Sequence, residues 1–282
     1  MSGKIKIATC QFAVSNSIRR NSTQIQKYIS AAKKARADIV HFSECALSGY
    51  VGTDFPSFDN YDWDLLKKET QNIIDLAAKK KLWVLLGSSH PLSKNNKPHN
   101  CLYLISHKGK VADRYDKRFC TSGDLHHFTS GGRFVYFTIN RVKCSLLICF
   151  DLRFPEIYRQ LYKKKVQCVF QSFYNARQPG PSLHTYIMRQ TMQCRAATNR
   201  MWVSMSNSSG YYSPYPSCMI RPDGKILKQL KSNKAGIMVN TIDTKMWIYD
   251  PMEPFRDIAI KGNLDNRIDT ISDPRSKNTN II

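Results

Sequence analysis

The sequence predicts a mixed α/β protein with two β-sheets. A strand-like, a helix-like and a second strand-like segment follow one another within residues 4–42, which is typical of a βαβ unit. After them, pairs of strands joined by short turns alternate with helical segments as far as residue 242. The length of 282 residues allows one large domain or two modest ones. Since no linker, composition break or low-complexity segment divides the chain, we expect a single domain over residues 1–282.

The opening unit is predicted from its periodicity. Residues 4–12 alternate between apolar and polar side chains, as a half-buried strand does. In residues 15–35, Ile18, Ile25 and Ile29 recur near helical spacing, so we expect an amphipathic helix there. Residues 37–42 are apolar and β-prone, and they predict a second strand that ends at Ser43-Glu44-Cys45.

The middle of the chain continues with a loop, a helix and five strands. The loop, rich in Gly, Pro, Asp and aromatic residues, covers residues 49–61, and the helix covers residues 64–81. The strands are expected at residues 82–87, 100–107, 110–115, 133–139 and 142–149. Two of the connections, Lys108-Gly109 and Asn140-Arg141, have the length and composition of hairpin turns.

The last third resumes the alternation of helices and strands. A helix follows Cys149, and Pro155 is tolerated in its first turn. The remaining elements are a strand at 166–172, a helix at 183–197, and strands at 201–206, 217–221, 225–231 and 236–242. Pro222-Asp223-Gly224 forms the turn between the last pair. From Asp250 the chain is polar, with little to bury, so we expect residues 250–282 to be an irregular C-terminal arm that packs on something else.

The net charge of +22 comes from 43 basic and 21 acidic residues. The lysine clusters are dispersed along the sequence, near the ends or on the exposed sides of predicted helices, where cations complement the helix dipole. No nucleic-acid-binding module and no basic stripe interleaved with aromatic residues is found. We therefore expect a solvated basic surface rather than a nucleic-acid partner.

Cysteine usage and hydropathy indicate a cytoplasmic protein. The nine cysteines are scattered singly, without a Cys-x-x-Cys pair, which argues against a disulfide framework and against a zinc site. No apolar run is long enough to span a bilayer, and no signal peptide is recognised. We expect no membrane partner.

Three residues that could carry chemistry follow predicted strands. Cys149 ends an apolar β-prone run, Glu44 ends another, and Lys117 follows a third. In α/β proteins the carboxyl ends of strands are where catalytic residues usually lie. Taken singly, Cys149 could be a buried core residue, and Glu44 and Lys117 could be surface charges. Taken together, they offer a thiol nucleophile, a carboxylate base and an ammonium for an oxyanion.

The flanks of these residues resemble the nitrilase (carbon–nitrogen hydrolase) superfamily. The motifs are Ser43-Glu44-Cys45-Ala46-Leu47-Ser48-Gly49-Tyr50, Tyr115-Asp116-Lys117-Arg118 and Cys149-Phe150-Asp151-Leu152-Arg153-Phe154-Pro155-Glu156. The resemblance, from Lys4 to about Asp250, implies a four-layer αββα sandwich with two mixed sheets between helical layers. It implies Glu44 as general base, Cys149 as nucleophile and Lys117 as oxyanion donor, with the backbone N–H of Phe150 as a second donor. Neither a metal nor an organic cofactor is implied.

The sequence departs from the family pattern at two positions. Where the family usually has a second glutamate, four residues before a Phe-x-x-Gly turn, this chain has Asp124. Asp124 is expected as a supporting carboxylate, reached by an inward loop or through a water, unless it only caps the loop next to Gly123. The family's histidine ahead of Arg195 is replaced by Ile187, and no role is transferred to the nearby His184.

Amide hydrolysis is the favoured reaction. The nucleophile is followed by Phe150-Asp151 instead of the Trp-Glu of true nitrilases, which resembles the amidase and ω-amidase branch. The product would be an acid and ammonia, formed through a thioester. An N-carbamoyl amine or amino-acid hydrolase with the same triad is the alternative, and a non-catalytic scaffold or nucleic-acid-binding protein is a third hypothesis.

Substrate-binding groups are expected in the loops around the triad. Tyr50, Tyr174 and Asn175 are candidates, although aromatic packing and an Asx turn would explain them equally well. The resemblance further implies a homodimer or a larger homo-oligomer.

Overall fold

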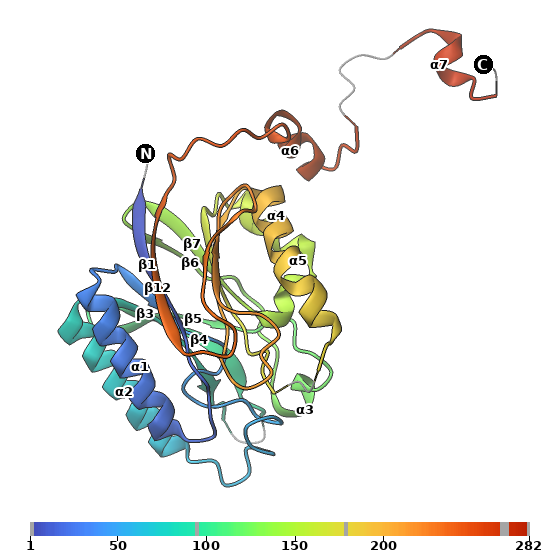
Figure 1. Ribbon diagram of the computed structural model, residues 1–282. Coiled ribbons are helices and arrows are strands. Elements are labelled where there is room, and N and C mark those ends of the chain that lie inside the picture. The colour runs from blue at the N-terminus through green and yellow to red at the C-terminus, as the bar shows by residue number, and fades with distance from the viewer. Residues whose placement is uncertain (1–2, 94–95, 178–179, 266–270, 281–282) are drawn as a thin grey trace. The chain divides into compact units, whose positions relative to one another are not determined.

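The computed structural model describes residues 3–93, 96–177, 180–265 and 271–280. The chain divides into two compact units, Met1–Trp247 and Ile248–Ile282. The first unit contains two six-stranded sheets, which are flanked by helices (Figure 1).

The first sheet is built around the predicted βαβ unit. Its strands β1, β2 and β3 are parallel, whereas β12, β4 and β5 each run antiparallel to their neighbour. The order across the sheet is β12 (Gly236–Asp243), β1 (Lys4–Gln11), β2 (Ile39–His41), β3 (Trp83–His90), β4 (His99–Ser106) and β5 (Lys110–Asp116). The predicted hairpin at Lys108-Gly109 joins β4 to β5 and is confirmed.

The second sheet repeats this arrangement. Strands β7, β8 and β9 are parallel, and β6, β10 and β11 pair antiparallel. The order is β11 (Ile226–Gln229), β10 (Cys218–Ile220), β9 (Trp202–Ser206), β8 (Cys168–Ser172), β7 (Val142–Ile148) and β6 (Tyr136–Ile139). Asn140 and Arg141 turn between β6 and β7, both with positive φ. Residues 133–135, predicted to begin that strand, lie outside it.

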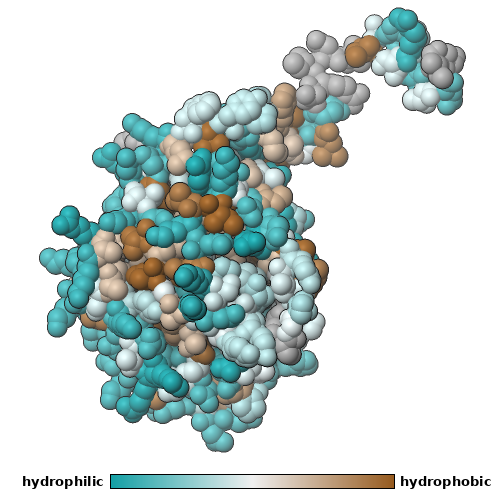
Figure 2. Space-filling model, in the orientation of Figure 1, coloured by the Kyte–Doolittle hydropathy of each residue, from teal (hydrophilic) through white to brown (hydrophobic). Residues whose placement is uncertain are grey.

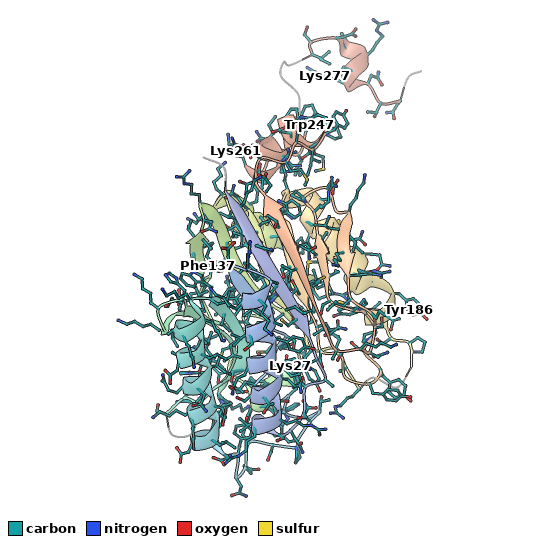
Figure 3. The ribbon with its side chains drawn as sticks, turned by 60° about the vertical axis from the view of Figure 1, so that its left-hand side comes forward. Lys27, Phe137, Tyr186, Trp247, Lys261 and Lys277 are labelled. Carbon is teal, nitrogen blue, oxygen red and sulfur yellow. The ribbon has the colours of Figure 1, made fainter. Side chains whose placement is uncertain are left out.

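Helices cover the outer face of each sheet. The first sheet carries α1 (Ile18–Lys34) and α2 (Trp63–Lys80), and the second carries α4 (Pro155–Lys163) and α5 (Leu183–Asn199) (Figure 1). In α1, Ile25 and Ile29 are fully buried, while Lys27 lies on the outer side (Figure 3). Hydrophilic residues cover the outer side of α1 and α2 (Figure 2). The predicted four-layer αββα sandwich is therefore confirmed.

A buried polar chain crosses between the two sheets. The Oγ of Ser172 donates its hydrogen to the carbonyl of Phe42 (2.8 Å), so it must accept from Nε2 of His41 (2.9 Å). Nδ1 of His41 then accepts from Ser204 Oγ (2.9 Å), which in turn accepts from Thr9 Oγ1 (2.8 Å). Burial lowers the pKa of His41 to about 3, so its ring is neutral. This chain holds the two sheets in one register close to the ends of β2 and β8.

The second unit corrects one expectation. Residues after Asp250 were expected to be irregular, but Glu253–Ile260 forms helix α6 and Pro274–Lys277 forms the short helix α7. Each has a proline in its first turn, where the missing N–H costs nothing. Phe255 and Ile258 are three residues apart, a helical spacing that the polar composition concealed.

The structure adds two general observations. In the part of the chain that it describes, no helix combines the length and the apolar character needed to cross a bilayer. All nine cysteines are free thiols, and most are buried.

Candidate active site

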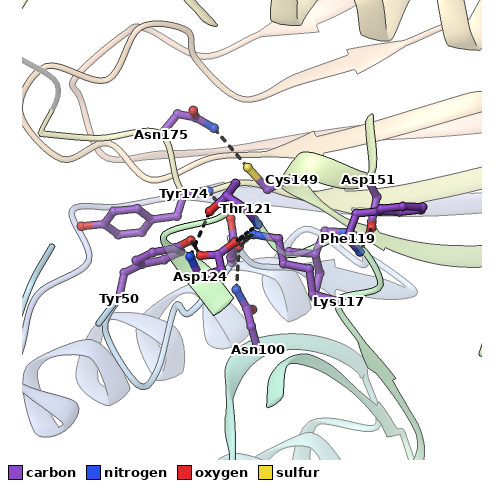
Figure 4. Close-up of polar contacts among 12 residues, drawn as sticks. Tyr50, Asn100, Lys117, Phe119, Thr121, Asp124, Cys149, Asp151, Tyr174 and Asn175 are labelled. Carbon is purple, nitrogen blue, oxygen red and sulfur yellow. Dashed lines mark hydrogen bonds and ion pairs between the residues drawn. The ribbon is translucent and has the colours of Figure 1, made fainter. Parts of the chain in front are cut away.

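The three predicted catalytic residues meet at one edge of the sandwich. Glu44 follows β2, Lys117 follows β5 and Cys149 follows β7, so all three lie beyond the carboxyl ends of strands. The Nζ of Lys117 donates to Oε1 of Glu44 (2.8 Å) and to Oδ2 of Asp124 (2.8 Å) (Figure 4). The charges of Glu44 and Lys117 both act on the thiol of Cys149. Residues 32 to 105 positions apart in sequence are thereby brought into one site.

Glu44 is fully buried, and hydrogen bonds occupy both of its oxygens. Oε1 accepts from Nδ2 of Asn100 (2.7 Å) as well as from Lys117, and Oε2 accepts from the backbone N–H of Tyr174 (2.9 Å). Burial raises the pKa of Glu44, although the ammonium of Lys117 opposes that rise. A carboxylate with a raised pKa can take up a proton and return it near neutral pH.

Lys117 is 1% exposed, which is unusual for a lysine. Burial alone would lower its pKa, but the negative charges around it, led by Glu44, raise the pKa well above the ordinary value. The side chain is therefore an ammonium at any working pH. Two carboxyl groups, those of Glu44 and Asp124, lie 2.8 Å from its Nζ and share this one ammonium.

Asp124 begins the short helix α3 (Asp124–His127) and reaches Lys117 directly. Its Oδ2 also accepts from the backbone N–H of Thr121 (2.9 Å), and its Oδ1 accepts from the hydroxyl of Tyr50. Burial would raise the pKa of Asp124, but Lys117 and these hydrogen bonds lower it. The shorter aspartate thus makes a direct ion pair, because helix α3 brings it inward.

Cys149 occupies a sharp turn between β7 and the 3₁₀ helix η1 (Cys149–Arg153). Its φ of 38° lies in the left-handed region, which non-glycine residues rarely adopt. The residue as a whole is partly exposed, and Nδ2 of Asn175 lies 3.5 Å from Sγ (Figure 4). Burial of the thiol and the charge of Glu44 raise the pKa of Cys149, so the resting form is the protonated thiol. A base is therefore needed to activate it.

Phe150 follows Cys149 in the first turn of η1. Backbone N–H groups in the first turn of a helix have no partner within the helix. The N–H of Phe150 therefore belongs to the turn that carries the nucleophile.

Asp151 holds the turn at Cys149 in place through hydrogen bonds, a role that was not recognised from the sequence. It is fully buried and accepts three hydrogen bonds: from Tyr115 Oη (2.7 Å), the N–H of Ile148 (2.9 Å) and the N–H of Phe119 (3.0 Å). These donors belong to β5, to β7 and to the segment after Lys117. Asp151 therefore fixes the positions of both the nucleophile and the lysine. An acid directly after an apolar strand was the only signal of this role in the sequence.

Asn100 was also missed. It begins the buried part of β4, and its side chain is oriented toward Glu44 rather than toward a substrate. A single asparagine near the start of a strand carries no sequence signal, because the contact joins residues 56 positions apart.

The three candidate binding residues surround the site but are already engaged. Tyr50 stacks on Tyr174 with ring centroids 4.7 Å apart, and the hydroxyl of Tyr174 donates to Oδ1 of Asp54 (2.8 Å). Nδ2 of Asn175 also contacts Oη of Tyr215 (2.5 Å). The hydroxyls of Tyr50 and Tyr174 already donate hydrogen bonds to carboxylates, so only the rings of these tyrosines are available to a substrate. His184, to which no role was transferred, has a side chain outside the described residues.

Comparison with known proteins identifies relatives that match most of this chain. A family model for carbon–nitrogen hydrolases matches residues 6–249. A "Hydrolase in agr operon" of Staphylococcus lugdunensis is 30% identical over 217 residues, covering 73% of this chain and 87% of that protein. The 2-oxoglutaramate amidase of Bacillus subtilis (strain 168) is 26% identical, covering 85% of this chain and 91% of that protein. The omega-amidase NIT2 of Mus musculus is 24% identical, covering 85% and 89%.

Solved structures show the same fold. An amidase from Nesterenkonia sp. superposes with a TM-score of 0.73 at 19% identity, over 86% of this chain and 90% of that chain. A mutant of the amidase from Nesterenkonia AN1, described as belonging to the nitrilase superfamily, gives the same TM-score. The resemblance drawn from the three motifs is confirmed.

Proposed function

Since this chain belongs to the carbon–nitrogen hydrolase family, we propose that it is a thiol-dependent amidase that hydrolyses the C–N bond of a small carboxamide. The overall reaction converts R–CO–NH₂ and water to R–COOH and ammonia. The observation that carries the proposal is the buried Lys117, held at 2.8 Å from both Glu44 and Asp124 beside the thiol of Cys149.

In the first half-reaction, Sγ of Cys149 attacks the carbonyl carbon while Glu44 takes the thiol proton. The pKa values of Glu44 and Cys149 are both raised. Cys149 is therefore a thiol at rest, and Glu44 accepts a proton more readily than an ordinary carboxylate, which supports a concerted transfer. The oxygen becomes negative and is stabilised by Lys117 Nζ and by the N–H of Phe150. Glu44 then returns the proton to nitrogen, the C–N bond breaks, and ammonia leaves a thioester on Cys149.

In the second half-reaction, water takes the place of ammonia. Glu44 removes a proton from the water, which attacks the thioester carbon, and the same two donors stabilise the oxyanion. Collapse of that intermediate breaks the C–S bond, and the proton held by Glu44 returns to sulfur. The free acid then leaves.

The relatives support an amide as substrate. Two of them are named for amidase activity, on 2-oxoglutaramate in one case. In one mutant of the similar Nesterenkonia amidase, the acetamide moiety of fluoroacetamide adds covalently to the active-site cysteine, and another mutant was obtained in complex with butyramide. We propose that the rings of Tyr50 and Tyr174, with Asn175, form the wall against which the acyl part of the substrate packs.

The test is to trap the acyl-enzyme. Purified protein is mixed with a panel of small carboxamides and N-carbamoyl compounds, quenched in acid and weighed intact, and released ammonia is measured in parallel. We expect an acyl adduct on Cys149 with amides, and none with the Cys149→Ala variant. Turnover of N-carbamoyl compounds without any amide turnover would favour the alternative reaction. A Cys149→Ala variant with undiminished biological activity would favour a scaffold.

We also propose that the enzyme is a homodimer or larger homo-oligomer, with residues 250–282 as an arm of a single 1–282 domain. Analytical ultracentrifugation of the full chain and of a chain ending at Ile248 tests this. A monomeric full chain would contradict it.

A further inference from the structure

Basic residues gather at the end of the sandwich that lies opposite the catalytic residues. Helices α1, α2 and α4 have basic residues in their last turns, and Arg200 directly follows α5. Each of the four helices leads into one of the parallel strands β2, β3, β8 and β9. Parallel strands of a sheet begin at the same edge, so these residues come together. We name them the basic end: Lys33, Lys34, Arg36, Lys79, Lys80, Lys81, Lys163, Lys164, Lys165 and Arg200.

The starting edges of the two sheets lie at the same end of the molecule. Glu44, after β2 of the first sheet, is bonded to the N–H of Tyr174, after β8 of the second. The ends at which the parallel strands finish therefore coincide, and so do the ends at which they start, where β1 also begins (Figure 1). Clusters that are dispersed in the sequence thus form one surface, on the far side from the thiol.

A hollow of about 380 Å³ lies within this surface, between the ends of α1 and α2. Lys33, Arg36 and Lys81 line it, together with His107, whose Nδ1 is buried and has no hydrogen-bond partner among the described residues. The acid in the lining, Asp38, has one oxygen occupied by the backbone N–H of Lys6 (2.7 Å). The hollow is therefore strongly cationic and has an open donor or acceptor at its wall.

Eight cations of the basic end have no acidic partner among the residues that the structure describes. For Lys33, Lys34, Arg36, Lys79, Lys80, Lys81, Lys163 and Lys164, no ion pair with an acid exists in the part of the chain that the structure describes. The acids Asp243 and Asp223 at this end are paired with Lys4 and Arg221.

Compensation of helix dipoles does not account for the whole set. It explains lysines in the last turns, such as Lys33 and Lys79. It does not explain Arg36, Lys81 and Lys165, which follow the helices with φ values of 56°, 49° and 58°. Glycine is favoured at such left-handed positions, so a basic side chain is present there in spite of backbone strain.

The composition of the surface favours an anionic membrane over a nucleic acid as its partner. Eight of its ten cations are lysines, which act as point charges, whereas recognition of nucleic-acid phosphates favours arginine. The surface is also built from helix ends on one side of a sandwich, not from a groove. Beyond the end of β12, which pairs at Lys4 with the same edge, Trp247 is 80% exposed (Figure 3). An exposed tryptophan that follows a strand at the same edge as the lysines suits the interface of a bilayer.

We propose that the basic end docks this enzyme on an anionic phospholipid membrane, with a headgroup phosphate in the hollow between α1 and α2. The catalytic edge then faces away from the membrane and stays open to small substrates. The sequence predicted no membrane partner, because the lysine clusters are far apart along the chain and no spanning segment exists. Peripheral docking on a membrane requires neither that the lysines be adjacent in the sequence nor that a helix span the bilayer.

The test is co-sedimentation of the full chain with vesicles of phosphatidylcholine, with and without phosphatidylserine. One variant removes four cations from the last turns of α1 and α2: Lys33→Gln, Lys34→Gln, Lys79→Gln and Lys80→Gln. The matched control removes four exposed cations from the other ends of the same helices: Arg19→Gln, Arg20→Gln, Lys67→Gln and Lys68→Gln. Amide turnover and thermal melting report whether each variant is folded.

We expect binding only to vesicles with phosphatidylserine, weakened by salt. The four-lysine variant should bind more weakly by about fivefold per lysine, or several hundredfold in all, whereas the control should change little. If that variant does not fold, substitution of Lys163, Lys164 and Lys165 by Gln, at the end of α4, should weaken binding by about a hundredfold. The proposal is overturned if wild-type protein ignores phosphatidylserine, if the control loses as much affinity, or if a DNA duplex is bound more tightly than the vesicles.

Discussion

Replacing Asp124 by Asn should change both the rate of the enzyme and its pH dependence. The substitution keeps the shape of the side chain and removes one of the two negative charges that hold Lys117. A hydrogen bond to a charged group contributes about 1.5–3 kcal/mol and a neutral one about 0.5–1.5 kcal/mol, so the loss is about 1–2 kcal/mol. If that loss falls on the oxyanion donor in the transition state, kcat/KM decreases about 5- to 30-fold.

The pH dependence provides a sharper test because its sign follows from the structure. The charge of Asp124 raises the pKa of Glu44, so its removal lowers that pKa. Activity requires Glu44 in its unprotonated form, and the acidic limb of kcat/KM reports this ionisation in the free enzyme. The acidic limb of Asp124→Asn should therefore move to lower pH.

Asn100→Ala should shift the same limb in the opposite direction. The hydrogen bond from Asn100 Nδ2 to Glu44 stabilises the carboxylate and lowers its pKa, so removal of the amide raises it. Both variants act on the pKa of Glu44, but they shift it in opposite directions. Opposite shifts therefore distinguish an effect on Glu44 from a general loss of structure in the site.

The assay is ammonia release from an accepted carboxamide across the acidic pH range. The exposed Asp59, in the loop before α2, provides the control substitution Asp59→Asn, which should leave the profile unchanged. Equal rates for wild type and Asp124→Asn, or shifts of the same sign in the Asp124 and Asn100 variants, would refute the assignment of Glu44 as the base.

Three further substitutions test how the site is held in place. Gly87→Ala puts a Cβ 2.0 Å from the carbonyl of Ser43, next to Glu44, so we expect a loss of about 1–3 kcal/mol of stability and a large fall in kcat. Asp151→Asn turns an amide donor toward buried donors and should lower the free energy of unfolding in urea by about 1–3 kcal/mol. His41→Gln should flatten the pH dependence of stability. The pKa of His41 falls from 6.5 unfolded to about 3 folded, so the wild type loses about 1.4 kcal/mol per pH unit as pH drops below 6.5.

Each of these has an outcome that would contradict it. Full activity of Gly87→Ala would mean that the backbone before Glu44 can move freely. An unchanged urea midpoint for Asp151→Asn would show that the turn is held by other contacts. Parallel stability curves for wild type and His41→Gln between pH 6.5 and 3 would mean that the ring is not buried as a neutral group.

Most secondary structure followed from local chemistry. The spacing of Ile18, Ile25 and Ile29 predicts α1 because a helix buries only one stripe. The turns at Lys108-Gly109 and Pro222-Asp223-Gly224 were recognised because glycine adopts positive φ without strain. Helix α6 was missed because a polar segment with two apolar residues three apart is too weak a signal.

The candidate catalytic residues were predictable for a related reason. Strand ends can be located from sequence, and the ends of parallel strands must meet at one edge. What could not be predicted are partners that act through long-range contacts. Asn100 reaches Glu44 from another strand, and Asp151 joins three segments, so neither has a local pattern.

By itself, the sequence determined most of the strands and helices of the first unit and the three side chains that follow strands, because these depend on periodicity and turn chemistry over a few residues. The tertiary structure alone decided the state of those side chains. Burial keeps Cys149 a thiol, and surrounding carboxylates keep Lys117 an ammonium. Assembly also converted scattered lysines into one charged end, because every helical crossover returns the chain to the same edge of its sheet. The charge state of a side chain and the distribution of charge on the surface depend on which residues are neighbours in space, and folding determines those neighbours.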